Sequence, residues 1–254
     1  MTHENETERR CFSFTKTETG TLQVAVNRFP DVCKLCGTEI SAFLGHRHCD
    51  ACIEEHEKAL TEEEDKKRVQ SLVEAGAIKP RTINATFQNS DEIAESKNQR
   101  AYQIAGGWDY RDKKNIWICG PKGVGKSYLA RCVVNKAIQK GATARECTAF
   151  EFERNCFKHF KDRHPWEIYY YDNILLIDDI DKAPWNDISL SALWQVLNER
   201  NETKKSTIVT CQFHGSQLAQ LWHDRFGKNT ATPGAAIDRM KPCISIEMFG
   251  NSLR

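Results

Sequence analysis

An eight-residue run near the middle of the chain has the composition and spacing of a phosphate-binding loop. Every position fits the pattern G-x-x-x-x-G-K-[ST], and the run consists of Gly120, Pro121, Lys122, Gly123, Val124, Gly125, Lys126 and Ser127. In such a loop the backbone N–H groups face the β-phosphate, the lysine neutralises the β- and γ-phosphates, and the hydroxyl ligates Mg²⁺. The run therefore predicts that ATP and Mg²⁺ bind around Lys126 and Ser127.

Two acidic residues offer the second half of the same chemistry. The apolar run 174–177 leads directly into Asp178 and Asp179, which places both carboxylates at the C-terminal end of a buried strand, beside the phosphates. We expect Asp178 to hold the Mg²⁺ shell and Asp179 to polarise the attacking water. The alternative is a turn whose acids are only solvated, and the glycine loop makes this the weaker interpretation. Asp181 is expected to have left the strand end.

Four cysteines near the N-terminus have the spacing of a metal site. Cys33 and Cys36 form one C-x-x-C pair, Cys49 and Cys52 form another, and twelve residues separate the pairs. Four thiolates at this spacing can surround Zn²⁺ and hold together a segment that has almost no core of its own. The alternative is four unrelated reduced cysteines. We expect a structural zinc ribbon that serves as a docking module.

The elements that must position the phosphate site alternate along the second half of the chain. A short apolar strand, 116–119, stops at Gly120, and an apolar residue every fourth position after the loop predicts a helix that ends at Gly141. Further strands are expected at 145–148, 174–177, 207–210 and 243–246, and further helices at 94–108, 150–161, 190–200, 218–222 and 235–240. This alternation predicts an α/β fold with a parallel sheet covered on both faces.

The first third of the chain divides into smaller regions. Residues 1–30 are polar and predict a hairpin or a loose tail, and the acidic and basic residues of 54–68 predict a solvated helix or linker. We therefore expect a four-cysteine zinc-binding domain over 1–53, a charged helical linker over 54–80, and an ATPase domain over 81–254.

The composition suits one sizeable domain with a small addition. The chain has 254 residues, 40% of them hydrophobic, and its net charge of +1 gives no overall indication of nucleic acid. Its 11 cysteines are an odd number and mostly scattered, which favours a reducing compartment. The sequence lacks an apolar run of membrane-spanning length and the apolar core of a signal peptide, so we expect a cytoplasmic protein with no membrane contact.

The segment from about Arg81 to Arg254 resembles the AAA+ ATPases of the DnaC and IstB type, which are helicase loaders and transposition helpers. The matching pieces are RTINATFQNS at 81–90, ILLIDDI at 174–180, TIVTCQF at 207–213, AAIDRM at 235–240 and FGNSLR at 249–254. The resemblance implies a P-loop AAA+ core with five parallel strands. The helical lid of larger AAA+ proteins is expected to be absent, because the sequence ends a few residues after the last expected strand.

The resemblance also assigns three further positions. Gln212 takes the sensor position, where an amide contacts the γ-phosphate or the water, although the family often has Asn there. Arg239 falls where the family carries the arginine that reaches the ATP of a neighbouring subunit, and a guanidinium there stabilises charge on the transferred phosphoryl group. Arg225 competes for that role, and a surface ion pair with Asp238 is the alternative for Arg239.

The leading functional hypothesis is ATP-dependent loading of a replicative helicase onto single-stranded DNA by a homo-oligomer, with the N-terminal domain gripping the helicase. Three alternatives remain: an ATPase helper of a transposase, a zinc-ribbon adaptor that uses ATP only as a switch, and, less favoured, a P-loop kinase.

One aromatic and basic stretch is the best local candidate for DNA contact. Its phenylalanines can stack on bases while its cations neutralise phosphates, and its members are Phe150, Phe152, Arg154, Phe157, Lys158, Phe160, Lys161 and Arg163. Because Phe150, Phe157 and Phe160 follow helical spacing, a core role for at least part of the set is the favoured interpretation.

Overall fold

The computed structural model describes most of the chain. The described residues are 12–16, 22–26, 31–33, 35–40, 50–88, 97–157, 164–226 and 232–250. The chain divides into two compact units, Met1–Glu63 and Glu64–Arg254.

The first unit contains two small antiparallel pairs of strands. β1 (Phe12–Lys16) pairs with β2 (Leu22–Val26), as the hairpin alternative predicts, and β3 (Asp31–Val32) pairs with β4 (Glu39–Ile40). Helix α1 (Asp50–Glu74) begins in this unit and contains the expected charged helix. Because most of its described side chains are exposed and charged, α1 lacks the apolar stripe of a core helix over most of its length.

The second unit is built on five parallel strands, as predicted. The strands are β5 (Asn115–Cys119), β6 (Ala144–Thr148), β7 (Ile174–Asp178), β8 (Ser206–Cys211) and β9 (Cys243–Glu247), and their order is β6-β7-β8-β5-β9. Every residue of β5, β7 and β8 is buried. The phosphate-loop strand β5 therefore lies between β8 and β9, and the C-terminal ends of β5, β7 and β8 meet at one edge of the sheet.

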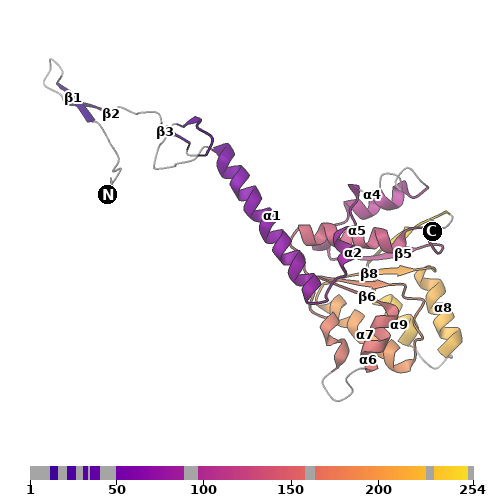
Figure 1. Ribbon diagram of the computed structural model, residues 1–254. Helices are drawn as coiled ribbons and strands as arrows, with labels where there is room; N and C mark the ends of the chain where they lie inside the picture. The colour runs from indigo at the N-terminus through magenta and orange to yellow at the C-terminus, as the bar shows by residue number, and fades with distance from the viewer. Residues whose placement is uncertain are drawn as a thin grey trace. The chain divides into compact units, whose positions relative to one another are not determined.

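Helices cover both faces of this sheet (Figure 1). They are α2 (Pro80–Ile83), α4 (Gln99–Gly107), α5 (Lys126–Gln139), α6 (Ala149–Phe157), α7 (Asp187–Glu202), α8 (Gly215–Phe226) and α9 (Thr232–Asp238), with 3-10 turns η2 (Tyr110–Asp112) and η3 (Pro165–Tyr169). Alternate residues of β5 belong to two apolar clusters: Ile116 packs in the cluster with α4 and α5, and Trp117 in the cluster with α6, α7 and α8. No helix in the described ranges is long and apolar enough to span a membrane.

Helix ends differ from the expectations where capping decides them. Helix α7 begins at Asp187, three residues before the expected start, because Asn186 and Ser189 form a capping box that satisfies the first N–H groups. Pro80, the last residue of the expected linker, opens α2, since a proline at the first helical position lacks the N–H that would otherwise need a hydrogen-bond partner.

Candidate active site

A polar cavity of about 340 Å³ lies at the sheet edge where the phosphate loop meets the ends of β7 and β8. Its lining residues are Lys122, Gly123, Gly125, Lys126, Ser127, Tyr128, Arg131, Asp179, Lys182 and Gln212. Four of these side chains are cationic and one is a carboxylate, so the cavity favours a polyphosphate. The N-terminus of α5 adds positive potential to the same place.

Gly125 allows the loop to turn into α5. It is the residue before the helix and has φ of 96°, a left-handed conformation that a residue with a side chain adopts only at a cost. The turn directs the first N–H groups of α5, including that of Ser127, toward the cavity. This is the arrangement that the loop pattern predicts.

Lys126 is a buried cation that is hydrogen-bonded to the loop backbone. It is only 6% exposed, and its Nζ donates hydrogen bonds to the carbonyl oxygens of Gly120 at 2.8 Å and Pro121 at 2.7 Å. Burial lowers the pKa of Lys126, while the carboxylates of Asp179 and Asp181 oppose that shift. The ammonium group is thus desolvated in advance and can exchange a carbonyl partner for a phosphate oxygen.

Gly120 has a packing role that the loop pattern does not indicate. Its φ is 144°, and a Cβ at this position would overlap the carbonyl oxygen of Met248. The N–H of Met248 donates to the carbonyl of Cys119 at 2.8 Å, so the chain after β9 runs tightly against the start of the loop. The glycine therefore also allows the close approach of another backbone.

Asp178 and Ser127 meet as the magnesium prediction requires. The Ser127 hydroxyl donates to Oδ1 of Asp178 at 2.6 Å, and the Thr210 hydroxyl donates to the same oxygen at 2.6 Å. Asp178 is the last residue of β7 and is 4% exposed. A serine hydroxyl beside a carboxylate is the hard oxygen set that Mg²⁺ takes in phosphate sites, so these residues fit the ion.

Asp179 lies at the cavity with a constrained backbone. Its φ is 56°, and its N–H donates to the Thr210 hydroxyl at 2.7 Å, which fixes the turn after β7. Burial raises the pKa of Asp179, and the charges of Asp178 and Asp181 raise it further, whereas Lys126 and Lys182 oppose the shift. A carboxylate with a raised pKa is a stronger proton acceptor when ionised.

Gln212 lines the cavity directly after β8, where the resemblance places the sensor. Its N–H donates to Oδ1 of Asp181 at 3.2 Å. As expected, Asp181 has left the strand, since β7 ends at Asp178 and Asp181 is not among the described residues that line the cavity. Its side chain is nevertheless only 3% exposed and pairs with Lys182 at 2.7 Å.

Arg131 and Thr210 are site residues that the sequence analysis missed. Arg131 lines the cavity and donates to Oδ2 of Asp178 at 2.7 Å. It lies four residues after Ser127, so both side chains occupy one face of α5. The sequence indicated Arg131 only as an arginine within the otherwise apolar run 129–134.

The two candidate trans-acting arginines lie elsewhere. The Arg239 guanidinium is 6.0 Å from the centre of the Trp194 ring, and that of Arg225 is 5.3 Å from the Phe226 ring. Neither is among the described residues that line the cavity. Neither arginine therefore acts on the cavity of its own chain in this arrangement.

Helix α6 carries the described part of the aromatic and basic stretch. Phe152 is fully buried, whereas Phe150 and Phe157 are 55% and 39% exposed, so the core expectation does not hold for these two. The buried stripe of α6 instead follows the spacing of Phe152 and Cys156. Four other members lie outside the described residues: Lys158, Phe160, Lys161 and Arg163.

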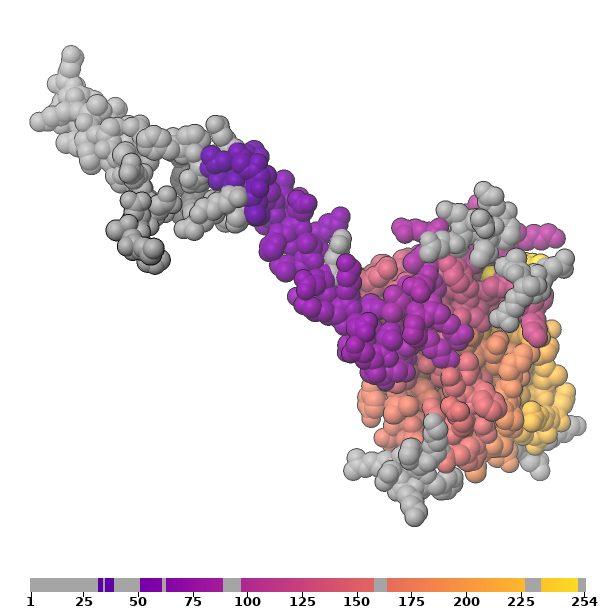
Figure 2. All heavy atoms as spheres, viewed as in Figure 1, coloured from indigo at the N-terminus to yellow at the C-terminus, as the bar shows by residue number. Residues whose placement is uncertain are grey.

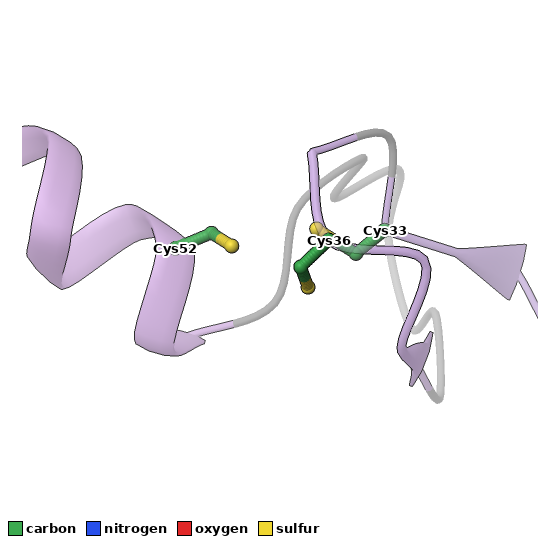
Figure 3. A group of neighbouring side chains, drawn as sticks. All are labelled: Cys33, Cys36 and Cys52. Carbon is green, nitrogen blue, oxygen red and sulfur yellow. The ribbon is translucent and has the colours of Figure 1, made fainter.

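Three of the four predicted zinc ligands come together in the first unit (Figure 3). The sulfur atoms of Cys33, Cys36 and Cys52 all lie within 4.8 Å of one another, and four sulfurs around Zn²⁺ are about 3.8 Å apart. The N–H of Gly37 donates to the carbonyl of Cys33 at 2.9 Å, and this hydrogen bond closes the tight turn that contains Cys33 and Cys36. Cys49 lies outside the described residues.

Two curated proteins are similar in sequence. One is the chromosomal replication initiator protein DnaA of Aliarcobacter butzleri, with 26% identity over 153 residues, covering 55% of this chain and 33% of that protein. Another is the putative insertion sequence ATP-binding protein y4pL of Sinorhizobium fredii, with 30% identity over 159 residues, covering 59% of this chain and 60% of that protein. The match spans less than two thirds of the length of either relative.

A solved structure shares the fold. The crystal structure of the DnaC helicase loader is similar with a TM-score of 0.51 and 17% identity, over 67% of this chain and 99% of that chain. The second unit therefore has the α/β fold of that structure. A family model described as IstB-like ATP binding protein matches residues 49–254, which include the phosphate loop, both acids and Gln212. The chain belongs to the family of IstB-like ATP binding proteins.

Proposed function

We propose that the chain binds ATP with Mg²⁺ at the phosphate loop and hydrolyses it. The observation that carries this proposal is the convergence of Lys126, the Ser127–Asp178 pair and Asp179 on one cationic cavity. Ser127 and Asp178 hold the magnesium ion, which neutralises phosphate charge, and Lys126 binds the β- and γ-phosphates. Val124 and the other non-proline residues of the loop supply backbone N–H groups.

In the proposed reaction, Asp179 orients a water molecule and accepts its proton. The water oxygen bonds to the γ-phosphorus while the bond between that phosphorus and the β,γ-bridging oxygen breaks, which yields ADP and inorganic phosphate. Gln212 can donate its amide hydrogens to the γ-phosphate or hold the water. The position of Asp179 in the lining of the cavity, together with Lys126 and Gln212, supports its role as proton acceptor.

We assign the remaining charge stabilisation to a second copy of the chain. Arg239 and Arg225 both lie outside the lining of the cavity of their own chain. An arginine of the second copy would then supply, across an interface, the positive charge that stabilises the leaving oxygen of the β-phosphate. The proposal is accordingly an ATP-dependent homo-oligomer in which Arg239, or in its place Arg225, completes the neighbouring site.

For the first unit we propose a structural Zn²⁺ bound by Cys33, Cys36, Cys49 and Cys52. The purified chain is expected to contain about one zinc per molecule, and Cys36→Ser should lose most of it, because three thiolates leave the tetrahedron open. Zinc content by atomic absorption measures this, with Cys243→Ser on β9 as the control that keeps its zinc. Full zinc content in Cys36→Ser would exclude Cys36 as a ligand.

As the biological role we propose loading of a replicative helicase onto single-stranded DNA in the cytoplasm, with the zinc unit contacting the helicase. The similar fold of the DnaC helicase loader supports this role, and so do the exposed rings of Phe150 and Phe157 beside Arg154, which suit stacked bases and phosphates. A second candidate, assistance to a transposase, is favoured by the 30% identity to an insertion sequence ATP-binding protein.

A loading assay separates the two candidates. A hexameric replicative helicase is given circular single-stranded DNA covered by single-strand binding protein, and its unwinding is measured with and without the full chain and ATP. Loading predicts at least about tenfold faster unwinding, since loading replaces a slow bimolecular encounter. No stimulation, together with ATP-dependent binding of the chain to a transposase, would establish the second candidate and exclude the first.

A further inference from the structure

A buried chain of ionic contacts leads away from the magnesium site. Arg131 is 7% exposed and lies between two carboxylates: its Nη2 donates to Oδ2 of Asp178 at 2.7 Å, and its Nε donates to Oε1 of Glu146 at 2.8 Å. The side chain of Glu146 is fully buried on β6. One guanidinium thus serves two buried anions, of which only Asp178 belongs to the site.

The other end of this chain is the segment 77–82, which follows α1. The Thr82 hydroxyl and, at 3.4 Å, the N–H of Lys79 donate to Oε2 of Glu146. The N–H of Glu146 in turn donates to the carbonyl of Ala77 at 2.7 Å. Figure 2 shows the purple residues that follow α1 lying directly on the surface of the α/β domain.

Hydrogen bonds from this segment decide how strongly Glu146 depends on Arg131. The negative charge of a buried carboxylate must be stabilised by hydrogen bonds or by a positive charge. The stabilisation of Glu146 that Thr82 and Lys79 do not provide must therefore come from the Arg131 guanidinium. The Arg81 guanidinium, 3.8 Å from Oε1, is 56% exposed and compensates little. A stronger interaction between Glu146 and Arg131 weakens the interaction between Arg131 and Asp178.

We propose that Arg131 is a positioning residue shared between Asp178 and Glu146, and that segment 77–82, acting through Glu146, sets the magnesium affinity of the ATP site. This inference rests on the proposed Mg²⁺·ATP site. It makes the sequence that joins α1 to the α/β domain a regulator of the nucleotide site. No residue of segment 77–82 is among the described residues that line the cavity, so this influence is indirect.

Two substitutions are expected to shift the magnesium affinity in opposite directions. Glu146→Gln removes the anion that competes for Arg131, so Arg131 neutralises Asp178 more fully. The Mg²⁺ concentration that half-saturates the ATP site, the midpoint of a Mg²⁺ titration, should then rise about fivefold. Thr82→Val removes a donor from Glu146, which then draws Arg131 away from Asp178, and the midpoint should fall about two- to threefold. A merely structural role would raise both midpoints.

The measurement is a Mg²⁺ titration of the full chain saturated with a fluorescent, non-hydrolysable ATP analogue, with thermal unfolding as a check on folding. Arg145→Met on the same strand, which loses an ion pair with Asp172, is the control and should stay within about twofold of wild type. If Glu146→Gln does not fold, a lower midpoint in Thr82→Val still supports the inference. A raised or unchanged Thr82→Val midpoint would overturn it. Failure of the wild type to bind the analogue with Mg²⁺ would contradict the proposed ATP site itself, whereas normal wild-type binding with an unchanged or raised Thr82→Val midpoint would contradict only this inference.

Discussion

Lys126→Ala is expected to abolish measurable ATP binding. The ammonium group is the buried cation of the phosphate loop, and we expect it to make two charge-assisted hydrogen bonds to the phosphates, which the substitution removes. At about 1.5 kcal/mol each, their loss weakens binding by about 100-fold or more. Isothermal titration calorimetry with Mg²⁺·ATP measures the change.

Lys136→Ala is the matched control for this prediction. Lys136 lies on the same helix α5, and its ammonium group donates to the carbonyl of Gly106 instead of facing the cavity. Its removal should leave ATP affinity within about twofold of wild type. Equal losses in both variants would show that Lys126 acts through the stability of α5, and unchanged binding in Lys126→Ala would exclude the phosphate loop as the ATP site.

Asp179→Asn is expected to bind ATP and to lose at least about 100-fold of its turnover. The amide keeps the size of the side chain and its contact with the cavity, but it cannot accept a proton from water, and general-base catalysis contributes about 10²–10⁴-fold. Removing a negative charge next to the phosphates should also leave ATP affinity equal or higher. Phosphate release and equilibrium binding, measured on the same sample, separate the two effects.

Asp224→Asn supplies the chemical control, because that carboxylate is on the exposed face of α8, where its described contacts are with the neighbouring side chains of Gln220 and His223. Its turnover should equal that of wild type. Should Asp179→Asn retain wild-type turnover, Asp179 would have no role in activating water, and Asp181 would be the next acid to examine.

The predictable part of the site consists of groups that are close in sequence or that end regular elements. The phosphate loop is a local pattern, and the apolar run before Asp178 indicates a buried strand with acids at its end. Parallel strands bring such ends to one edge, so the meeting of Ser127 with Asp178 follows from local pattern and sheet topology together.

The contacts that the sequence could not predict join residues far apart along the chain. Arg131 and Asp178 are separated by 47 residues, and Thr82 and Glu146 by 64. Local propensity gives no information about such pairs, because tertiary packing decides which side chains meet. The contact between Asp181 and the N–H of Gln212 is of the same kind, because it joins residues 31 positions apart after the ends of β7 and β8.

Helix α6 shows the limit of periodicity. Phe150, Phe152 and Phe157 are all apolar, so several stripes of this helix are compatible with burial. The start of the helix at Ala149 and its contacts decide in favour of Phe152, and these depend on the sheet and on η3. The rings of Phe150 and Phe157 are exposed instead, which agrees with the proposed stacking on DNA bases.

Hydrolysis of ATP at this cavity is best measured as γ-phosphate release by the wild-type full chain. Release is measured from labelled ATP with Mg²⁺ or with a chelator, at protein concentrations that favour self-association and with single-stranded DNA present. We predict release that requires Mg²⁺ and is absent from Lys126→Ala. Tight binding of Mg²⁺·ATP by the wild type without phosphate release under any of these conditions would contradict the proposed hydrolysis and leave an ATP-binding switch.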